Sequence, residues 1–130
     1  MARIIFTLLV LVALPLPGNT AAAADEKASR TLRLVAYNIK HGRGMDGKVD
    51  LERIAAVLRE LKPDLVALQE VDNKCARSGT VDEAEALGKL LGMEHRFGKF
   101  MDFQGGEYGL AVLSRFPITD SMRHPLAPGA

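Results

Sequence analysis

Two apolar runs separated by an amphipathic stretch dominate the pattern of this sequence. The first run, residues 31–38, ends in Asn38, and the second, residues 64–70, ends in Glu70. Continuous apolar runs of this length are typical of buried strands. Between them, apolar residues recur at three- and four-residue intervals, which predicts a helix with one apolar face. The pattern therefore predicts a strand, a helix and a second strand.

The predicted helix has clear ends. Asp50 is placed to accept hydrogen bonds from the amides of the first turn, and Pro63 ends the helix. A strand–helix–strand unit makes the two strands parallel, and neighbouring strands lie about 4.8 Å apart. We therefore expect Asn38 and Glu70 to meet at the carboxyl edge of one sheet, where open α/β sheets bind ligands. An amide and a carboxylate oxygen at that edge suit a hard divalent cation.

The rest of the chain gives weaker signals. Thr80 and Glu83 have the spacing of a capping box for a second helix, which Gly92 is expected to end. Further short strands are predicted at 94–97, 110–113 and 118–122, and loops at 39–49, 71–79, 98–108 and 125–130.

The first 24 residues have the anatomy of a secretory signal peptide. A basic start precedes an apolar run at 4–14, prolines, and small residues at 21–24, the order found in cleaved signals. The alternative is a membrane anchor, but the run is shorter than the roughly 20 apolar residues that span a bilayer. The mature domain, residues 25–130, is then expected to be secreted or periplasmic, with no transmembrane helix.

The charge and cysteine content of the chain bear on which molecules the protein binds and on how its fold is stabilised. The chain carries 17 Lys and Arg against 16 Asp and Glu, and removal of residues 1–24 takes away only Arg3, which leaves zero net charge. No strong basic patch is therefore expected for nucleic acid. Cys75 is the only cysteine, so the exported domain must rely on its core or on a bound metal. Composition gives no indication of the oligomeric state.

Three segments together resemble the endonuclease/exonuclease/phosphatase superfamily: residues 37–39, 63–71 and 106–118. That superfamily includes deoxyribonuclease I-like nucleases, abasic-site endonucleases, sphingomyelinases and inositol-phosphate phosphatases. The resemblance implies an α/β fold, a four-layer sandwich of two mixed β-sheets with flanking helices. It also implies phosphoester hydrolysis with bound Mg²⁺, or Mn²⁺ in its place, and makes Asn38 and Glu70 the catalytic and metal-binding residues.

The resemblance covers only the N-terminal half of the superfamily's domain. The second half of that domain carries a catalytic His, a Gly-Asp-x-Asn segment and a terminal Asp-His pair, and this sequence has none of them. We therefore expect an incomplete sandwich and a truncated phosphoesterase that is inactive alone. Its open sheet face should expose apolar side chains and promote association. The alternative is a non-catalytic fragment or a degenerate binding module.

Three further residues are candidates for binding the phosphoester substrate: His41, Arg77 and Tyr108. The alternatives are loop surface charge for His41 and its neighbour Arg43, a plain exposed arginine for Arg77, and loop packing for Tyr108. Asp72 is most simply a solvated acid, with support of a metal ligand as the alternative. Zero net charge and export favour a lipid-like or small phosphodiester over nucleic acid.

Overall fold

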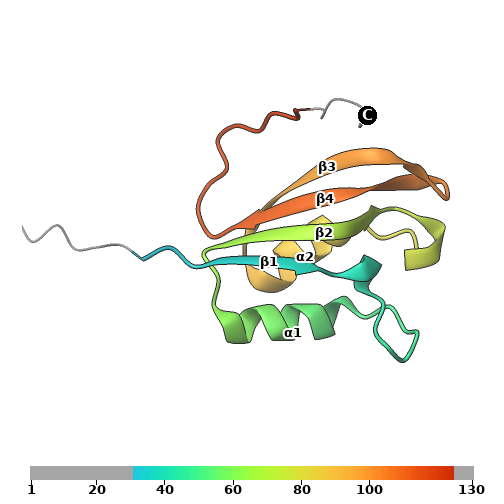
Figure 1. Cartoon of the computed structure of the whole chain (residues 1–130), viewed down its shortest axis with the longest axis horizontal. Helices are drawn as coiled ribbons and strands as arrows, with labels where there is room; N and C mark the ends of the chain where they lie inside the picture. Colours follow the sequence, from blue (N-terminus) through green and yellow to red (C-terminus); the bar gives the residue numbers. More distant parts are fainter. Residues whose placement is uncertain (1–30, 125–130) are drawn as a thin grey trace, which may run out of the picture. The chain divides into compact units, whose positions relative to one another are not determined.

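The computed structural model describes residues 31–124, so the predicted signal peptide and the predicted loop at 125–130 lie outside the described residues. Within this range the chain forms a mixed four-stranded sheet with two helices (Figure 1). The elements, in chain order, are β1 (Leu34–Asn38), η1 (Lys40–Gly42), α1 (Leu51–Leu61), β2 (Leu65–Asn73), η2 (Ala76–Ser78), α2 (Glu83–Leu91), β3 (Glu94–Phe103) and β4 (Gly106–Ser114).

The sheet has the strand order β1-β2-β4-β3. β1 and β2 are parallel, with Asn38 beside Gln69, and α1 connects them as predicted. β4 is antiparallel to both β2 and β3. The predicted α/β class, a mixed sheet with flanking helices, is therefore confirmed.

Both helices begin at an aspartate. Asp50 accepts a hydrogen bond from the backbone amide of Arg53, as predicted. Asp82 has the same role at the start of α2. The predicted capping box of Thr80 and Glu83 is wrong, because the helix begins later and Glu83 is buried inside the domain.

β3 and β4 form a hairpin that contains the predicted strands at 94–97 and 110–113 and extends well beyond both. They are joined at Gln104 and Gly105, whose φ angles of 45° and 79° are both positive, as in the two-residue turns that match strand twist. The predicted loop at 98–108 is wrong, because both strands continue through it. The predicted strand at 118–122 is wrong as well, since residues 115–124 form no strand.

The core lies between the two helices and one face of the sheet (Figure 1). Its largest buried side chains, at most 1% exposed, are Leu58 on α1, Leu87 on α2, Val66 and Leu68 on β2, and Leu113 on β4. Each such side chain contributes roughly 1.5–3 kcal/mol when it leaves water. This burial holds both helices against the same side of the sheet.

The opposite face of the sheet is exposed. Leu34, Leu110 and Val112 are 64%, 56% and 46% exposed. The register places Ala36, Ala67 and Val112 in one row across three strands. The structure thus shows the apolar exposure that the resemblance predicts, whereas association through this face stays a prediction.

Replacement of Leu110 and Val112 by threonine tests that prediction. Threonine is β-branched and suits a strand, so the Leu110→Thr, Val112→Thr variant should keep the sheet while it removes exposed apolar surface. We expect it to elute as a smaller species than the unchanged chain in size-exclusion chromatography at equal concentration. Phe116→Thr, outside the strands, is the control. Equal elution of variant and unchanged chain, with equal circular dichroism, would contradict the prediction.

Candidate functional site

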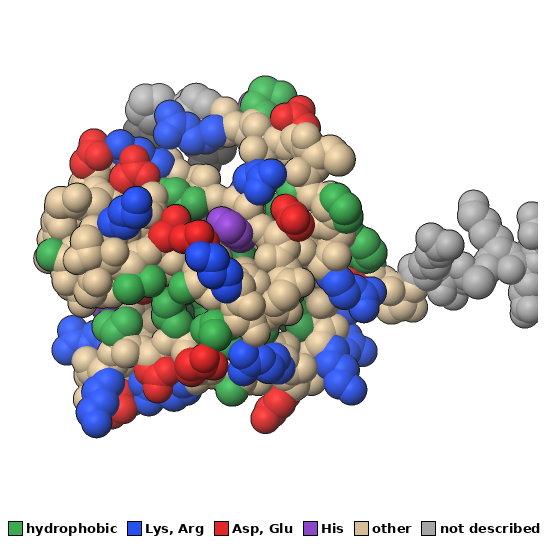
Figure 2. Space-filling model, turned by 180° about the vertical axis from the view of Figure 1, so that it is seen from behind, with side chains coloured by type: hydrophobic (Ala, Val, Ile, Leu, Met, Phe, Trp, Pro, Cys, Tyr) green, Lys and Arg blue, Asp and Glu red, His purple; other side chains and the backbone are tan. Residues whose placement is uncertain are grey.

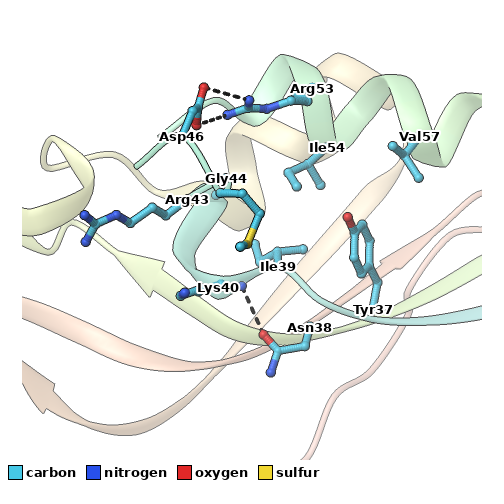
Figure 3. A pocket seen from close by; sticks show the side chains of 12 residues that line it. Tyr37, Asn38, Ile39, Lys40, Arg43, Gly44, Asp46, Arg53, Ile54 and Val57 are labelled. Atoms are coloured by element: carbon cyan, nitrogen blue, oxygen red, sulfur yellow. Dashed lines mark hydrogen bonds and ion pairs between the residues drawn. The ribbon is translucent and has the colours of Figure 1, made fainter. Parts of the chain in front are cut away.

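Asn38 and Glu70 meet at the carboxyl edge of β1 and β2. Nδ2 of Asn38 donates a hydrogen bond to Oε1 of Glu70 over 2.8 Å. Oδ1 of Asn38 accepts from the backbone amide of Lys40 over 3.0 Å (Figure 3). The predicted convergence is confirmed. In this arrangement the amide of Asn38 acts as a donor that orients the carboxylate, and its role as a direct metal ligand stays a prediction.

A β-bulge places Glu70 outside the regular ladder of β2. Gln69 pairs with Leu110 and Val71 pairs with Gly109, so Glu70 is the extra residue. Its φ of 56° is left-handed, a conformation that costs roughly 1–2 kcal/mol for a residue with a Cβ. Bulges and strained residues of this kind concentrate at functional sites. The bulge keeps Val71 in the core while Glu70 stands at the edge of the sheet.

Asp72 and Arg77 form a bidentate ion pair beyond the bulge. Nε and Nη2 of Arg77 each donate to one oxygen of Asp72 over 2.8 Å. The Asp72 side chain is fully buried and that of Arg77 is 27% exposed. Burial would raise the pKa of Asp72, but the hydrogen bonds from Arg77 outweigh burial and hold the pKa below its ordinary value. The interpretations of Asp72 as a solvated acid and Arg77 as a plain exposed arginine are therefore wrong.

The guanidinium of Arg77 also lies over two aromatic rings. Its central carbon is 4.4 Å from the ring centroid of Phe103 and 5.4 Å from that of Tyr108, distances at which a cation is attracted to the ring face. Burial, and next the charge of Glu70, raises the pKa of Tyr108. Tyr108 therefore stands within electrostatic range of the candidate metal ligand. Phe103 was missed from the sequence because it fell in the wrongly predicted loop.

His41 lies among the same charges. It is 8% exposed, and its buried Nδ1 has no hydrogen-bond partner among residues 31–124. Burial, and next the charge of Arg77, lowers the pKa of His41, whereas Asp72 and Glu70 oppose that shift. The net shift favours the neutral form of the ring. Loop surface charge, the alternative for His41, is wrong, because the ring is buried beside the site.

Glu83 is a buried carboxyl that supports this region from α2. Its Oε2 accepts a hydrogen bond from the backbone amide of Asp72 over 2.8 Å, and its buried Oε1 has no partner in the part of the chain that the structure describes. Burial raises the pKa of Glu83 to about 7. Glu83 thus fixes the backbone just beyond the bulge, a role that sequence reasoning missed because the residue fitted a helix-capping pattern.

Residues 35–129 match the Endonuclease/Exonuclease/phosphatase family, and the chain therefore belongs to that family. A solved endonuclease/exonuclease/phosphatase from Beutenbergia cavernae is 29% identical, with a TM-score of 0.54, over 69% of this chain and 27% of that one. A family protein from Leptotrichia buccalis is 18% identical, with a TM-score of 0.52, over 69% of this chain and 40% of that one, a likeness of fold alone. The chain thus spans less than half the length of either structure. Comparison with curated proteins gives no match.

Members of this family generally hydrolyse phosphoester bonds with the help of a divalent metal. Between residues 31 and 124, no three His, Cys, Asp or Glu side chains come together to hold an ion. The same part of the chain has no helix long and apolar enough to cross a membrane.

The donor set around Glu70 fits Mg²⁺ or Mn²⁺ nevertheless. Oε1 of Glu70 is held by Asn38, and within the described range Oε2 takes part in no hydrogen bond or ion pair. Mg²⁺ is commonly bound by one or two carboxylates, keeps several waters and takes further oxygens from a substrate phosphate. One oriented carboxylate with an available oxygen meets that requirement.

Strain at the bulge predicts different stabilities for two variants that both remove the carboxylate of Glu70. Glu70→Ala keeps a Cβ in the left-handed conformation, whereas Glu70→Gly relieves it. We expect the free energy of unfolding of Glu70→Gly to exceed that of Glu70→Ala by about 1 kcal/mol, measured by urea denaturation. A Glu70→Gly variant less stable than Glu70→Ala would show that residue 70 is not strained.

Glu83 predicts a pH dependence of stability. Because the pKa rises from 4.5 to about 7 on folding, its stabilising contribution is full below pH 4.5 and is lost as the pH rises through 7. The unchanged chain should lose on the order of 3 kcal/mol of unfolding free energy over this window. Glu83→Gln, which cannot ionise, should remove that loss in denaturation experiments across pH. Glu60→Gln, at an exposed site, should leave it in place; identical pH profiles for both variants would contradict the assignment.

Proposed function

We propose that this chain carries the metal-binding part of a divalent-metal-dependent phosphoesterase site, with Glu70 as the ligand of Mg²⁺ or Mn²⁺. The observation that carries the proposal is the position of Glu70, at a strained bulge and held by Asn38. Family membership supports the reaction class. Export through a signal peptide at residues 1–24, and inactivity of the chain alone, stay predictions.

When bound, the ion would polarise a phosphoryl oxygen and offset the negative charge that develops during in-line attack. The protein groups orient the carboxylate for that purpose. The backbone amide of Lys40 fixes Asn38, and Asn38 fixes one oxygen of Glu70. This arrangement leaves the other carboxylate oxygen available at the edge of the sheet.

Arg77 is proposed as the anchor of the substrate phosphate. Two of its nitrogens are bound to Asp72, while Nη1 has no hydrogen-bond partner in residues 31–124. Because the ion pair and the rings of Phe103 and Tyr108 already hold the guanidinium, little side-chain freedom remains to be lost when a phosphate binds. His41 and Tyr108 are proposed as further contacts, since both lie in electrostatic range of Glu70.

Charge distribution supports a small or lipid-like phosphodiester over nucleic acid. On the face shown in Figure 2, Lys and Arg side chains are interspersed with Asp and Glu. The whole chain carries a formal net charge of only +1. Sequence-independent binding of nucleic acid depends on neutralising many phosphates at once, and interspersed charges serve that purpose poorly.

The alternative is a binding module that holds a metal or a phosphate without turnover. Two observations favour it: the exposed apolar sheet face, and one carboxylate at the site without a cluster of three ligating side chains between residues 31 and 124. The alternative differs from the phosphoesterase in activity and not in metal binding.

Metal binding and hydrolysis are therefore measured separately. Glu70→Gln should lower Mn²⁺ affinity at least tenfold in electron paramagnetic resonance titrations, because the ion loses its charged ligand. Where the unchanged chain hydrolyses bis(p-nitrophenyl) phosphate with Mg²⁺, the same substitution and EDTA should each abolish turnover. Glu60→Gln is the matched control.

The outcomes separate the two candidates. Undiminished Mn²⁺ binding by Glu70→Gln would contradict the proposed metal ligand. Metal binding that depends on Glu70, without hydrolysis by the unchanged chain, is expected both of the binding module and of a phosphoesterase that is inactive alone. Hydrolysis that Glu70→Gln abolishes would exclude the binding module and contradict the predicted inactivity.

A further inference from the structure

The loop between η1 and α1 presents cations and an exposed methionine beside the candidate site. Met45 at its tip is fully exposed, at 102%. Lys40, Arg43 and Lys48 are exposed too, and none of them takes part in an ion pair within residues 31–124. The combination of an exposed large apolar side chain with several unpaired cations distinguishes this loop from the mixed charges elsewhere.

Hydrogen bonds hold this loop in shape. The amide of Gly44 donates to the carbonyl of Lys48 over 2.9 Å, and Arg43 and Val49 form an isolated β-bridge. Asp46, the one acid between residues 39 and 49, is paired with Arg53 over 3.1 Å (Figure 3). The pair offsets the negative charge of Asp46, so the three unpaired cations set the electrostatic character of the tip.

The loop is directly connected to the site. The amide of Lys40 fixes Asn38, the partner of Glu70. A cavity of about 560 Å³ lies beside Asn38, and the labelled side chains of Tyr37, Ile54 and Val57 form its apolar wall (Figure 3). A surface that contacts the loop tip would therefore lie close to the edge where phosphoester hydrolysis is proposed.

We propose that this loop docks onto an anionic phospholipid surface. Met45 enters the boundary between headgroups and acyl chains, while Lys40, Arg43 and Lys48 contact lipid phosphates. Charge complementarity supports this occupant, since each cation near an anionic leaflet raises binding roughly fivefold. A nucleic acid would use the same cations but would leave Met45 exposed to water.

Docking of this loop on a membrane indicates that the substrate is a lipid phosphoester. This part of the inference rests on the proposed function. A loop seated on the leaflet places the Asn38–Glu70 edge at the level of the headgroups. The phosphoester group of a lipid would then reach Glu70 and Arg77 without leaving the membrane. The docking itself needs neither metal nor turnover.

A tryptophan at the loop tip tests the proposal directly, because the sequence contains no tryptophan. In the full chain, Met45→Trp should show a blue-shifted emission with vesicles of phosphatidylcholine and phosphatidylserine, and no shift with phosphatidylcholine alone. Added salt should reverse the shift. Adding Lys40→Gln, Arg43→Gln and Lys48→Gln should weaken vesicle binding roughly a hundredfold, with circular dichroism confirming that the fold is kept.

Met122→Trp, at a methionine that is 75% exposed outside the loop, is the matched control. Absence of a shift for Met45→Trp with the vesicles that contain phosphatidylserine would overturn the proposal, as would an equal shift for Met122→Trp. A blue shift of Met45→Trp with duplex DNA as large as that with anionic vesicles would overturn it in favour of a nucleic-acid surface. Absence of vesicle binding with retained Mn²⁺ binding would contradict the docking and not the proposed function. Vesicle binding without Mn²⁺ binding would contradict the proposed function and not the docking.

Discussion

The extra residue at the bulge of β2 is the constraint on which the site depends. Side chains of a strand alternate between its two faces, so one inserted residue changes the face of everything that follows. With Glu70 outside the ladder, Val71 returns to the core and Asp72 falls on the opposite side. A regular strand would instead direct Glu70 toward the core and turn Asp72 away from Arg77.

Burial of the Asp72 carboxylate requires a cation close beside it. A buried carboxylate without a cation is strongly destabilising, and Arg77 meets that need with two hydrogen bonds. The geometry that satisfies Asp72 also fixes Arg77 over Phe103 and Tyr108. Glu83 holds the same backbone with one oxygen, while the other has no partner within the described residues. The region thus joins a stable ion pair to an unsatisfied carboxyl, the combination expected where a site is built at some expense of stability.

The parts of the fold that depend on local sequence signals were predicted correctly, and the parts that depend on contacts between distant residues were not. Asp50, Pro63 and the apolar face of α1 are local signals, and the unit they define brought Asn38 to Glu70 as expected. The bulge has no such local signal. Residues 65–68 are all apolar, so no alternation of polar and apolar residues indicates which face of the strand Glu70 lies on. Of the β3–β4 hairpin only the outer ends, 94–97 and 110–113, were predicted as strands. One face of the hairpin is open, which made the polar strand residues nearer the turn resemble a loop. Contacts of Asp72 and Glu83 depend on tertiary neighbours and could not be predicted from spacing.

The same hydrogen bonds connect the exposed loop to the candidate metal ligand. Lys40 and His41 both have left-handed φ angles, 48° and 44°, so the chain turns sharply just after Asn38. This turn aims the amide of Lys40 back at Oδ1 of Asn38, which leaves Nδ2 to face Glu70. The orientation of the carboxylate is therefore set by the backbone of the segment that leads into the cationic loop. If that loop docks on a lipid surface as proposed, one short path of hydrogen bonds would position the docking residues and the metal ligand relative to each other, without the need for a second domain to align them.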